Sequence, residues 1–483
     1  LMNTPFFPQL RPRLAALGAR VQHLRTQSLL QLEVLFGHLV PPWLLSQTDE
    51  GANSRDRVFS LRRTFWAFLY QVLTPDCPCR EIVRQIQAFF CLHEMRAVDE
   101  GTSAYCQARA RLPLDTLQRL RHAVAAQAEK LLPSAQQRWF GLSPKVIDGT
   151  TVTGPDTPKN QRAYPQTSSQ KPGCGFPLLK LVGLFSLASG VLLDYAKGNK
   201  HQHELALLHK LLDHFKPKDL ALADRGFSCY TLIALLLLRN VQSLFRLHQG
   251  RSSDLRKGQR LGKNDRLMTW RKPKQKPRYL PQYLWKLVPK ELSVRVLRFT
   301  LKVRGFRSQS VTLVTTLLDA KAYPAQELAR LYARRWRIEL WFRHIKTSMG
   351  MESLRCQSPK MMHKELEMFL IAYNLIRALM AEAGAIYDVP IERISFKGTV
   401  DAARQYSIAI AQARSKKKQR QLVAQLLEVL ALDRVPERPG RVEPRALKGR
   451  PKPFALLTKH RRRFKDIPHR NAYKKRNPRK TTS

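Results

Sequence analysis

The sequence predicts an α/β fold that is preceded and followed by helical regions, and three observations support this prediction. Apolar residues recur at helical spacing up to about residue 140. From Lys145 the pattern becomes one of short apolar strands and helices in the order β-β-β-α-β-α-β. Asp148 lies on the first of these strands, and Asp224 ends the fourth. Three antiparallel strands that lead into parallel α/β units, with acidic residues at these two places, are the order of an RNase H-like fold.

The first predicted unit is a helical N-terminal domain, residues 1–140. Its last two predicted helices, 102–112 and 113–124, carry four arginines: Arg109, Arg111, Arg119 and Arg121. Basic side chains on short helices fit a DNA-binding module, and amphipathic helices of this kind equally fit a domain that only packs against its neighbours. The sequence leaves both interpretations open.

The first part of the predicted RNase H-like core covers residues 141–248. Strands are expected at 146–152, 178–187, 191–196, 220–224 and 242–248, and helices at 203–215 and 231–238. Small apolar residues before Asp224 and a glycine at Gly226 predict a strand that runs into a tight turn. An Asp at the end of a strand is also a common turn former or helix cap, so neither Asp148 nor Asp224 identifies a site by itself.

The alternation of strands and helices then stops, and residues 249–318 are predicted to be a β-rich insertion. Two strands are expected at 294–303 and 310–317, after a segment with four prolines between Pro273 and Pro289. The insertion also carries Trp270 and Trp285 among many basic residues. These tryptophans could stack on a base or pack in a small β core, and both interpretations remain open.

The helical pattern returns in residues 319–385, the predicted second part of the core, and the final region, 386–483, is predicted to be helical and then basic. Within the second part, four polar residues fall at offsets of three, seven and fourteen: Tyr332, Arg335, Glu339 and Lys346. On one helix they would share a face. The cations suit phosphate oxygens and the carboxylate suits a metal ion, although a solvated amphipathic helix would show a similar pattern.

The overall charge indicates a polyanionic partner. Lys and Arg number 85 against 36 Asp and Glu, which gives a formal net charge of +49. Such a surface attracts nucleic acid. No apolar run is long enough to span a bilayer and no signal peptide is visible, so we expect the chain to work in the cytoplasm. The seven cysteines are scattered, which excludes a disulfide framework, and the spacing around Cys77 and Cys79 does not fit a zinc knuckle.

Three carboxylates could meet if the chain folds as predicted. Asp148 and Asp224 would lie on adjacent strands, and a late helix would bring Glu339 to them. Three carboxylates packed together repel one another, so a pair of divalent cations is the natural compensation. Two Mg²⁺ ions roughly 3.5–4 Å apart can activate one oxygen and stabilise another in a phosphoryl transfer. The nearby Glu204, beside His201 and His203, is interpreted as part of an ordinary helix start rather than a ligand.

These motifs together resemble the DDE transposases of bacterial insertion sequences, in the group with a Y-R-E-K signature and a β-rich insertion. The matching text is D-G-T-T at Asp148, A-D-R-G-F around Asp224 and Y-x(2)-R-x(3)-E-x(6)-K from Tyr332 to Lys346. Flanking text is also similar, and the resemblance covers about residues 55–385. It does not extend to the N-terminal segment before residue 55 or to the tail after about residue 430.

The resemblance implies cut-and-paste DNA transposition by metal-dependent strand cleavage and strand transfer. By motif position, Asp148, Asp224 and Glu339 would be the catalytic metal ligands for two Mg²⁺ ions, with Mn²⁺ as a substitute. Tyr332, Arg335 and Lys346 would bind DNA phosphates, and Trp285 or Trp336 would stack on a base. Expected partners are the terminal inverted repeats of an element, target DNA and a second copy of the chain in a synaptic complex at the bacterial nucleoid. The alternatives are a catalytically silent DNA-binding derivative and an RNase H-like metal nuclease.

Overall fold

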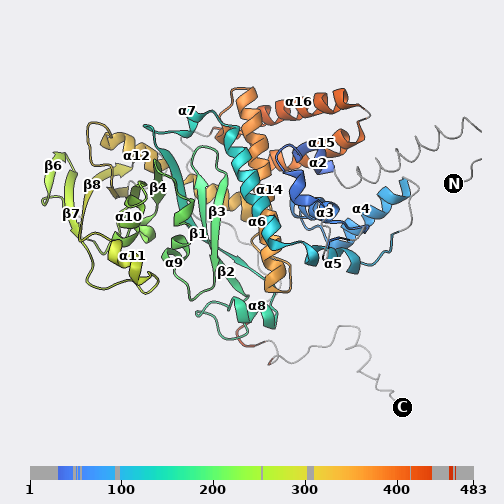
Figure 1. The fold of residues 1–483 in the computed structure, drawn as a ribbon, viewed down its shortest axis with the longest axis horizontal. Helices are drawn as coiled ribbons and strands as arrows, with labels where there is room; N and C mark the ends of the chain where they lie inside the picture. The colour runs from blue at the N-terminus through green and yellow to red at the C-terminus, as the bar shows by residue number, and fades with distance from the viewer. Residues whose placement is uncertain are drawn as a thin grey trace, which may run out of the picture.

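A single mixed β-sheet of nine strands forms the central layer of the protein in the computed structural model (Figure 1). The structure describes residues 31–46, 51, 53–54, 57–92, 98–251, 254–301, 309–413, 415–437, 456–460 and 463. The strands are β1 (Ser143–Thr153), β2 (Leu178–Ser186), β3 (Leu192–Gly198), β4 (Asp219–Ala223), β5 (Gln242–Arg246), β6 (Gln259–Gly262), β7 (Asp265–Arg271), β8 (Glu291–Leu301) and β9 (Gln309–Thr315). Their order in the sheet is β3-β2-β1-β4-β5-β9-β8-β7-β6.

The first five strands confirm the strand positions that the sequence predicts between residues 141 and 248. β1, β2 and β3 are antiparallel to one another, whereas β1, β4 and β5 are parallel. The helices between them are α8 (Pro158–Ala163), α9 (Glu204–His209), η2 (Leu212–His214), η3 (Arg225–Phe227) and α10 (Tyr230–Leu237). The helix expected at 203–215 is thus a short α-helix followed by a 3₁₀ turn, and α8 is an addition that periodicity did not predict.

Strands β6 to β9 extend the same sheet instead of forming a separate core. β9 pairs antiparallel with β5, and β8, β7 and β6 follow in order. The strands expected at 294–303 and 310–317 correspond to β8 and β9. The segment before them, expected to be basic loops, contains β6, β7 and α11 (Gln282–Leu287). Their short length and charged exposed residues hide the strand period from a sequence pattern.

Helices surround the sheet, and the central one is α14 (Pro359–Ile386). The other helices are α2 (Gln31–Phe36), η1 (Pro42–Leu45), α3 (Leu61–Leu73), α4 (Cys79–Leu92), α5 (Ser103–Arg111), α6 (Leu114–Lys130), α7 (Ser134–Gln137), α12 (Ala325–Arg334), α13 (Arg337–Arg343), η4 (His344–Ser348), η5 (Ile391–Arg393), α15 (Phe396–Gln412) and α16 (Lys416–Leu432). In the described part of the chain, α14 is the helix with the length and apolarity of a membrane span, but 83% of its most apolar window is buried. It is therefore a core helix against which α6 packs (Figure 1).

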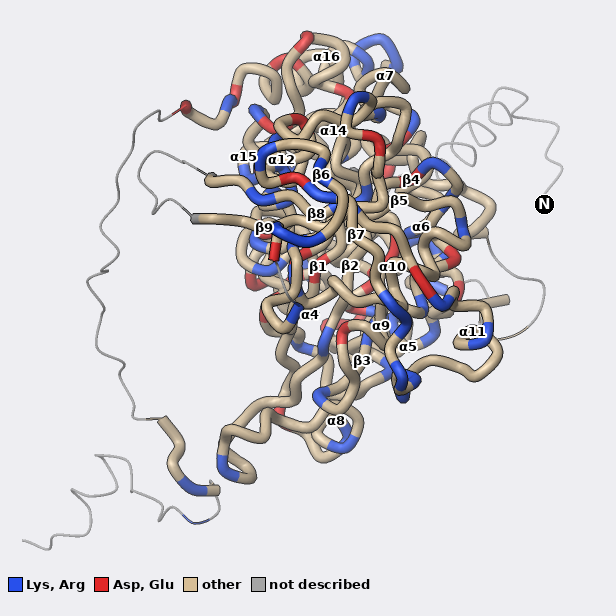
Figure 2. The backbone as a smooth tube through the Cα atoms, turned by 90° about the vertical axis from the view of Figure 1, so that its left-hand side faces the viewer, with Lys and Arg blue, Asp and Glu red and all other residues tan. Residues whose placement is uncertain are grey.

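The two faces of the sheet bury different cores because successive strand residues point in opposite directions. Val146 on β1 belongs to a core that includes α14, α6 and the helices before them. Its neighbour Ile147 belongs to a second core with α9, α10 and part of β8. Basic residues lie along most of the described chain, with acidic positions fewer, as Figure 2 shows. The charge predicted to attract a polyanion is therefore distributed over the whole molecule.

Candidate active site

Asp148 and Asp224 are brought together by the parallel pairing of β1 and β4. The last paired residues in this register are Val146 and Leu222. Asp148 lies two residues beyond Val146 on β1, and Asp224 lies two residues beyond Leu222, just after the end of β4 at Ala223. Both residues therefore lie at the same end of two neighbouring strands, and the charge of Asp224 acts on Asp148.

Asp148 lies in an environment that disfavours its charge. Burial raises the pKa of Asp148 to about 6, and the carboxylates of Asp224 and Glu204 act in the same direction. A hydrogen bond from the backbone N–H of Gly149 to Oδ1 (2.8 Å) and the charge of Arg335 oppose this shift. The net result is a partly buried acidic group whose pKa is raised chiefly because burial disfavours its charge.

Asp224 also has the structural role that the sequence leaves open for it. It caps the 3₁₀ turn η3, where its Oδ1 accepts a hydrogen bond from Gly226 N at 2.9 Å. The cap uses one carboxylate oxygen and fixes the orientation of the other. Asp224 can therefore cap the turn with one oxygen and still contribute its other oxygen to the acidic cluster.

Arg335 links Glu339 to Asp148. One nitrogen of the guanidinium, Nη1, lies 3.5 Å from Asp148 Oδ2, and Nη2 lies 3.9 Å from Glu339 Oε1. Arg335 is buried, with 5% of its surface exposed, whereas about half of the Glu339 side chain is exposed. A cation thus lies between the first and third predicted carboxylates.

The stripe from Tyr332 to Lys346 is not one regular helix, which corrects the sequence expectation. α12 ends at Arg334 and α13 begins at Arg337, with Arg335 and Trp336 between them. The segment from His344 to Ser348, η4, is a π-helix, which is a wider turn that changes the direction of the residues along it. Lys346 lies in this turn and is partly buried. Tyr332, Arg335 and Glu339 remain close to one another, but within the described residues the side chain of Lys346 makes no hydrogen bond or ion pair with them.

Two buried polar groups beside the carboxylates have no hydrogen-bond partner within the described residues: the hydroxyl of Tyr332 and Nε of Arg335. Tyr332 is 2% exposed, and the guanidinium carbon of Arg335 lies 5.7 Å from the centroid of its ring. Burial raises the pKa of Tyr332 to about 12, so its hydroxyl remains a donor. Buried donors without acceptors are costly, and an anionic ligand would satisfy them.

Glu204 is the acidic neighbour that sequence interpretation missed. It begins α9, on the face of the sheet opposite to α14, and its carboxylate lies against the backbone of Gly149. A Cβ atom added at Gly149 would be only 2.3 Å from Glu204 Oε1. Burial and the charge of Asp224 raise the pKa of Glu204, and Lys180 lowers it. The signal in the sequence was the Gly after Asp148, which allows this close approach, but only tertiary structure shows what approaches.

The tryptophans considered for base stacking lie in three different places. The ring of Trp336 is beside Arg335, whose guanidinium carbon is 5.2 Å from the ring centroid, and 48% of the residue is exposed. Trp285 on α11 packs under Lys272 Nζ at 4.2 Å, and Trp270 on β7 packs under Arg251 at 4.1 Å. Trp285 and Trp270 both pack against the core that contains β8, so the packing interpretation applies to them in this state.

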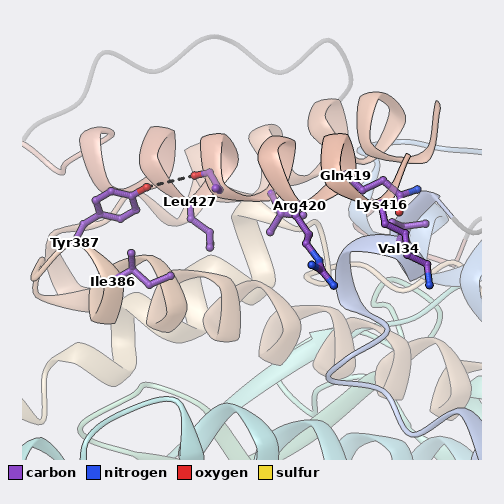
Figure 3. A pocket seen from close by; sticks show the side chains of 9 residues that line it. Val34, Ile386, Tyr387, Lys416, Gln419, Arg420 and Leu427 are labelled. Carbon is purple, nitrogen blue, oxygen red and sulfur yellow. Dashed lines mark hydrogen bonds between the residues drawn. The ribbon is translucent and has the colours of Figure 1, made fainter. Parts of the chain in front are cut away.

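The acidic cluster fits a divalent cation by its chemistry. Burial raises the pKa of Asp148 and of Glu204, and the charge of Asp224 adds to both shifts; hard oxygen ligands of this kind are the ones that Mg²⁺ prefers. By contrast, the apolar cavity of about 430 Å³ between α2, the end of α14 and α16 has no carboxylate in its lining (Figure 3). That cavity therefore cannot hold a metal-dependent site.

Comparison with known proteins gives the family. Residues 106–375 match the family described as Transposase DDE domain. The chain is 29% identical over 428 residues to the transposase InsG for insertion sequence element IS4 of Escherichia coli (strain K12), which covers 86% of this chain and 92% of that protein. It is also 30% identical over 137 residues to the putative transposase InsZ of the same organism, covering 28% of this chain and 45% of the relative.

A solved structure titled as the piggyBac transposase synaptic complex with hairpin DNA aligns over 83% of this chain and 85% of that chain. Its TM-score is 0.40 and its sequence identity 9%, values too low to establish a shared fold. The family match, in contrast, spans more than half of the sequence and contains Asp148, Asp224 and Glu339. The chain belongs to the transposase DDE domain family and is a DNA transposase.

Proposed function

We propose that Asp148, Asp224 and Glu339 are the catalytic carboxylates of this transposase, held in an RNase H-like core. The observation that supports the proposal is the parallel pairing of β1 and β4, which have Asp148 and Asp224 at the same end, together with Arg335 between Asp148 and Glu339. The sheet order β3-β2-β1-β4-β5, with three antiparallel strands and then two parallel ones, supports the RNase H-like assignment.

The three carboxylates would hold two Mg²⁺ ions, for which Mn²⁺ is a chemical substitute. When bound, such ions supply activation of the attacking oxygen and stabilisation of the leaving oxygen in an in-line displacement at phosphorus. Asp148 must lose its proton to act as a ligand, and its raised pKa makes that step sensitive to the local positive charge. Asp224 presents its second oxygen while the first remains bound to Gly226 N.

Arg335 and Tyr332 are proposed to bind a phosphate of the cleaved strand. Arg335 in this state is paired with carboxylates, and a guanidinium can exchange a carboxylate for a phosphate because both accept its fork of donors. The unsatisfied Tyr332 hydroxyl and Arg335 Nε support a ligand at this place. Lys346 would add a second cation once DNA is present, and Trp336, half-exposed beside Arg335, is better placed than Trp285 to stack on a base near the same phosphate.

Glu204 is proposed as a fourth carboxylate that acts with the catalytic three. Its charge adds to the burial that raises the pKa of Asp148, and the charge of Asp224 acts on Glu204 in the same way, whereas Glu339 lies beside Arg335. A carboxylate in this position can bind the metal ion directly, or it can accept a hydrogen bond from a water molecule bound to the metal. In either role, Glu204 makes the cluster more negative and so favours a divalent cation.

The larger organisation is also a proposal. Residues 1–140 would contact DNA, 141–248 and 319–385 would form the catalytic core, 249–318 would be the β-rich insertion, and 386–483 would add helical and basic DNA contacts. The DNA partners would be terminal inverted repeats and target DNA, with two copies of the chain in one synaptic complex at the bacterial nucleoid in the cytoplasm. The formal charge of +49 supports a nucleic-acid partner.

The test is strand cleavage with the three carboxylates neutralised one at a time. The substrate is a supercoiled plasmid that carries the reading frame with its flanking DNA, incubated with the full-length protein and Mg²⁺ or Mn²⁺. Asp148→Asn, Asp224→Asn and Glu339→Gln should each reduce nicking and joining by at least about a hundredfold, because a metal ligand supplies several kcal/mol to the transition state.

The matched control is Asp213→Asn, since Asp213 is an 89% exposed side chain of the same region and its neutralisation should leave cleavage unchanged. DNA binding, measured by filter retention, should persist in all four variants. A variant that still cleaves would remove its residue from the site, and nicking without joined products would indicate a nuclease in place of a complete transposase.

A further inference from the structure

A second cluster of metal-ligating side chains lies at the edge of the sheet, away from the three catalytic carboxylates. It consists of Asp194 on β3, His122 on α6 and His214 in η2. One ligand atom from each of the three lies within 4.8 Å of the other two. Among the described residues, it is the one group of three or more metal-ligating side chains whose ligand atoms lie this close together. The proposed catalytic function does not use it.

The geometry of the cluster converges on one point. His122 Nε2 lies 3.3 Å and His214 Nε2 lies 2.5 Å from the same oxygen of Asp194, Oδ2. The two imidazole rings stack with centroids 5.7 Å apart. Ligands of a tetrahedral metal ion at about 2.0–2.1 Å are separated by roughly 3.3 Å, so only the shorter of these contacts must open to admit an ion. Both histidines can move, because 46% of the His122 side chain and 39% of the His214 side chain are exposed.

The carboxylate of Asp194 is held in place by a network of buried ion pairs and hydrogen bonds. Asp194 is 7% exposed, and its other oxygen, Oδ1, is paired with Arg121 Nη2 at 2.7 Å. Arg121 Nε in turn donates to Glu367 on α14 at 2.9 Å. Glu367 is fully buried and also accepts a hydrogen bond from Tyr195 at 2.8 Å. Metal sites use such outer hydrogen bonds to orient a ligating carboxylate, and here they are already in place.

We propose that His122, Asp194 and His214 form a structural site for a transition-metal ion, best suited to Zn²⁺, with water as the fourth ligand. Two imidazole nitrogens and one carboxylate oxygen favour Zn²⁺ over Mg²⁺, which prefers oxygen ligands alone. The bound ion would fasten α6 to the edge of the sheet at β3 and to the segment that leads into β4. Because β4 ends beside Asp224, the site would also stabilise the framework of the acidic cluster.

The same contacts set the charge of the three side chains. The hydrogen bond to Asp194 raises the pKa of His214. Burial opposes ionisation of Asp194, but hydrogen bonds from His122 and His214 and the charge of Arg121 hold its pKa well below the usual range. A metal ion would replace the protons that these imidazoles direct at Oδ2, so binding should release protons and weaken at acid pH. Two further charges act on the cluster: Lys197 on β3 interacts with Asp194, and Asp213 interacts with His214.

The experiment is Zn²⁺ titration of the full-length protein by calorimetry in excess Mg²⁺, on an Asp148→Asn background that weakens metal binding at the catalytic carboxylates. We expect one equivalent of Zn²⁺ with a Kd of about 1 µM or tighter. His122→Ala and His214→Ala should each weaken this binding at least tenfold. The matched control is His201→Ala, because His201 is exposed, precedes α9 and belongs to no cluster in the described chain.

Two further readouts decide the outcome. Co²⁺ in place of Zn²⁺ should give the visible absorption of a four-coordinate ion in the control and not in His122→Ala. Zn²⁺ should raise the unfolding midpoint of the control and leave that of His122→Ala unchanged. Binding that is equally tight in His122→Ala, His214→Ala and the control, or no binding below about 100 µM in any of them, would overturn the proposal without affecting the assignment of the catalytic carboxylates.

Discussion

At the scale of single residues, the acidic cluster depends on how charge is distributed around Asp148. Its carboxylate is partly buried, accepts one backbone hydrogen bond and lies 3.5 Å from Arg335. Arg335 also lies 3.9 Å from Glu339. If Arg335 binds a phosphate as proposed, it would exchange these ion pairs when DNA and metal bind.

Glu204→Gln tests the fourth carboxylate. Removal of its charge should lower strand cleavage by about tenfold to a hundredfold, which is the usual range for a side chain that supports metal ligands, and lower Mn²⁺ affinity in calorimetry in parallel. The control is Glu327→Gln, in which a partly exposed glutamate of α12 paired with Arg330 is neutralised. If Glu204→Gln cleaves DNA and binds Mn²⁺ as the control does, Glu204 has no part in the site.

His344 gives a pH prediction that is separate from the catalytic carboxylates. Burial, with the charges of Arg377 and Arg343, lowers the pKa of His344 to about 3, and its ring stacks on Phe396 at 4.4 Å. An unfolded histidine titrates near pH 6.5, so the unfolded chain binds more protons between about pH 3 and 6.5. His344 therefore contributes stability above pH 6.5 that is lost as the pH falls through this window.

His344→Phe should flatten that dependence, because phenylalanine keeps the stack and cannot be protonated. We expect the difference in unfolding midpoint between pH 7 and pH 5 to be smaller in the variant than in the parent chain. The variant also removes the buried Nδ1 that has no hydrogen-bond partner. His201→Phe, at an exposed site, is the control. Identical pH slopes in the parent and His344→Phe would show that His344 is not kept neutral by folding.

At the scale of secondary-structure elements, the approach of α9 to β1 is the contact that sequence did not reveal. β1 carries Gly149 at the point where Glu204, the first residue of α9, lies against it. A strand residue with a side chain would push this carboxylate away. The segment from α12 to η4 also differs from the sequence prediction. A break at Arg335 and a π-helical turn at Lys346 replace the single helix that the spacing predicts.

Gly149→Ala tests that contact. The new Cβ would lie 2.3 Å from Glu204 Oε1, and because a carboxylate at the end of a flexible side chain can move, the fold should persist while Glu204 is displaced. Cleavage should then fall as far as it does in Glu204→Gln. The double variant should be no worse than either single one, since both remove the same interaction.

Gly262→Ala on β6 is the matched control, because its Cβ would meet Asp265 at an ordinary 3.6 Å. Full activity in Gly149→Ala would mean that Glu204 can leave its position without consequence. Additive losses in the double variant would show that the two residues act separately.

At the scale of the whole molecule, charge is the property that composition predicts best. Residues 438–483 contain 17 Lys and Arg against two acidic residues, and all but a few of these positions lie outside the described residues. Each phosphate neutralised by a cation releases counterions, so affinity for DNA should fall steeply with salt. The tail and the described part of the chain should both contribute to that slope.

Truncation after Glu437 should reduce the slope of log Kd against log salt concentration and weaken binding to any duplex DNA by a similar factor. Cleavage at saturating DNA should change little, since the proposed catalytic residues all precede the truncation. Fluorescence anisotropy with an unrelated 30-base-pair duplex gives the slope. An unchanged slope would show that the tail does not contact phosphates, which is the solubilising interpretation of its charge.

The sequence by itself determined where the first five strands lie along the chain, because strands follow from periodicity and turn residues. It also placed Asp148 and Asp224 on the first and fourth strands, which pair in the sheet. The excess of basic residues indicated a polyanionic partner. Only the tertiary structure decided that β6 to β9 extend the same sheet, that Arg335 lies between Asp148 and Glu339, and that Glu204 approaches through Gly149. The pairing of His122 with Asp194 and His214 was equally invisible. Local patterns reflect which way a residue faces within its own element, whereas contacts between residues far apart depend on how the elements pack, and packing is set by the whole chain at once.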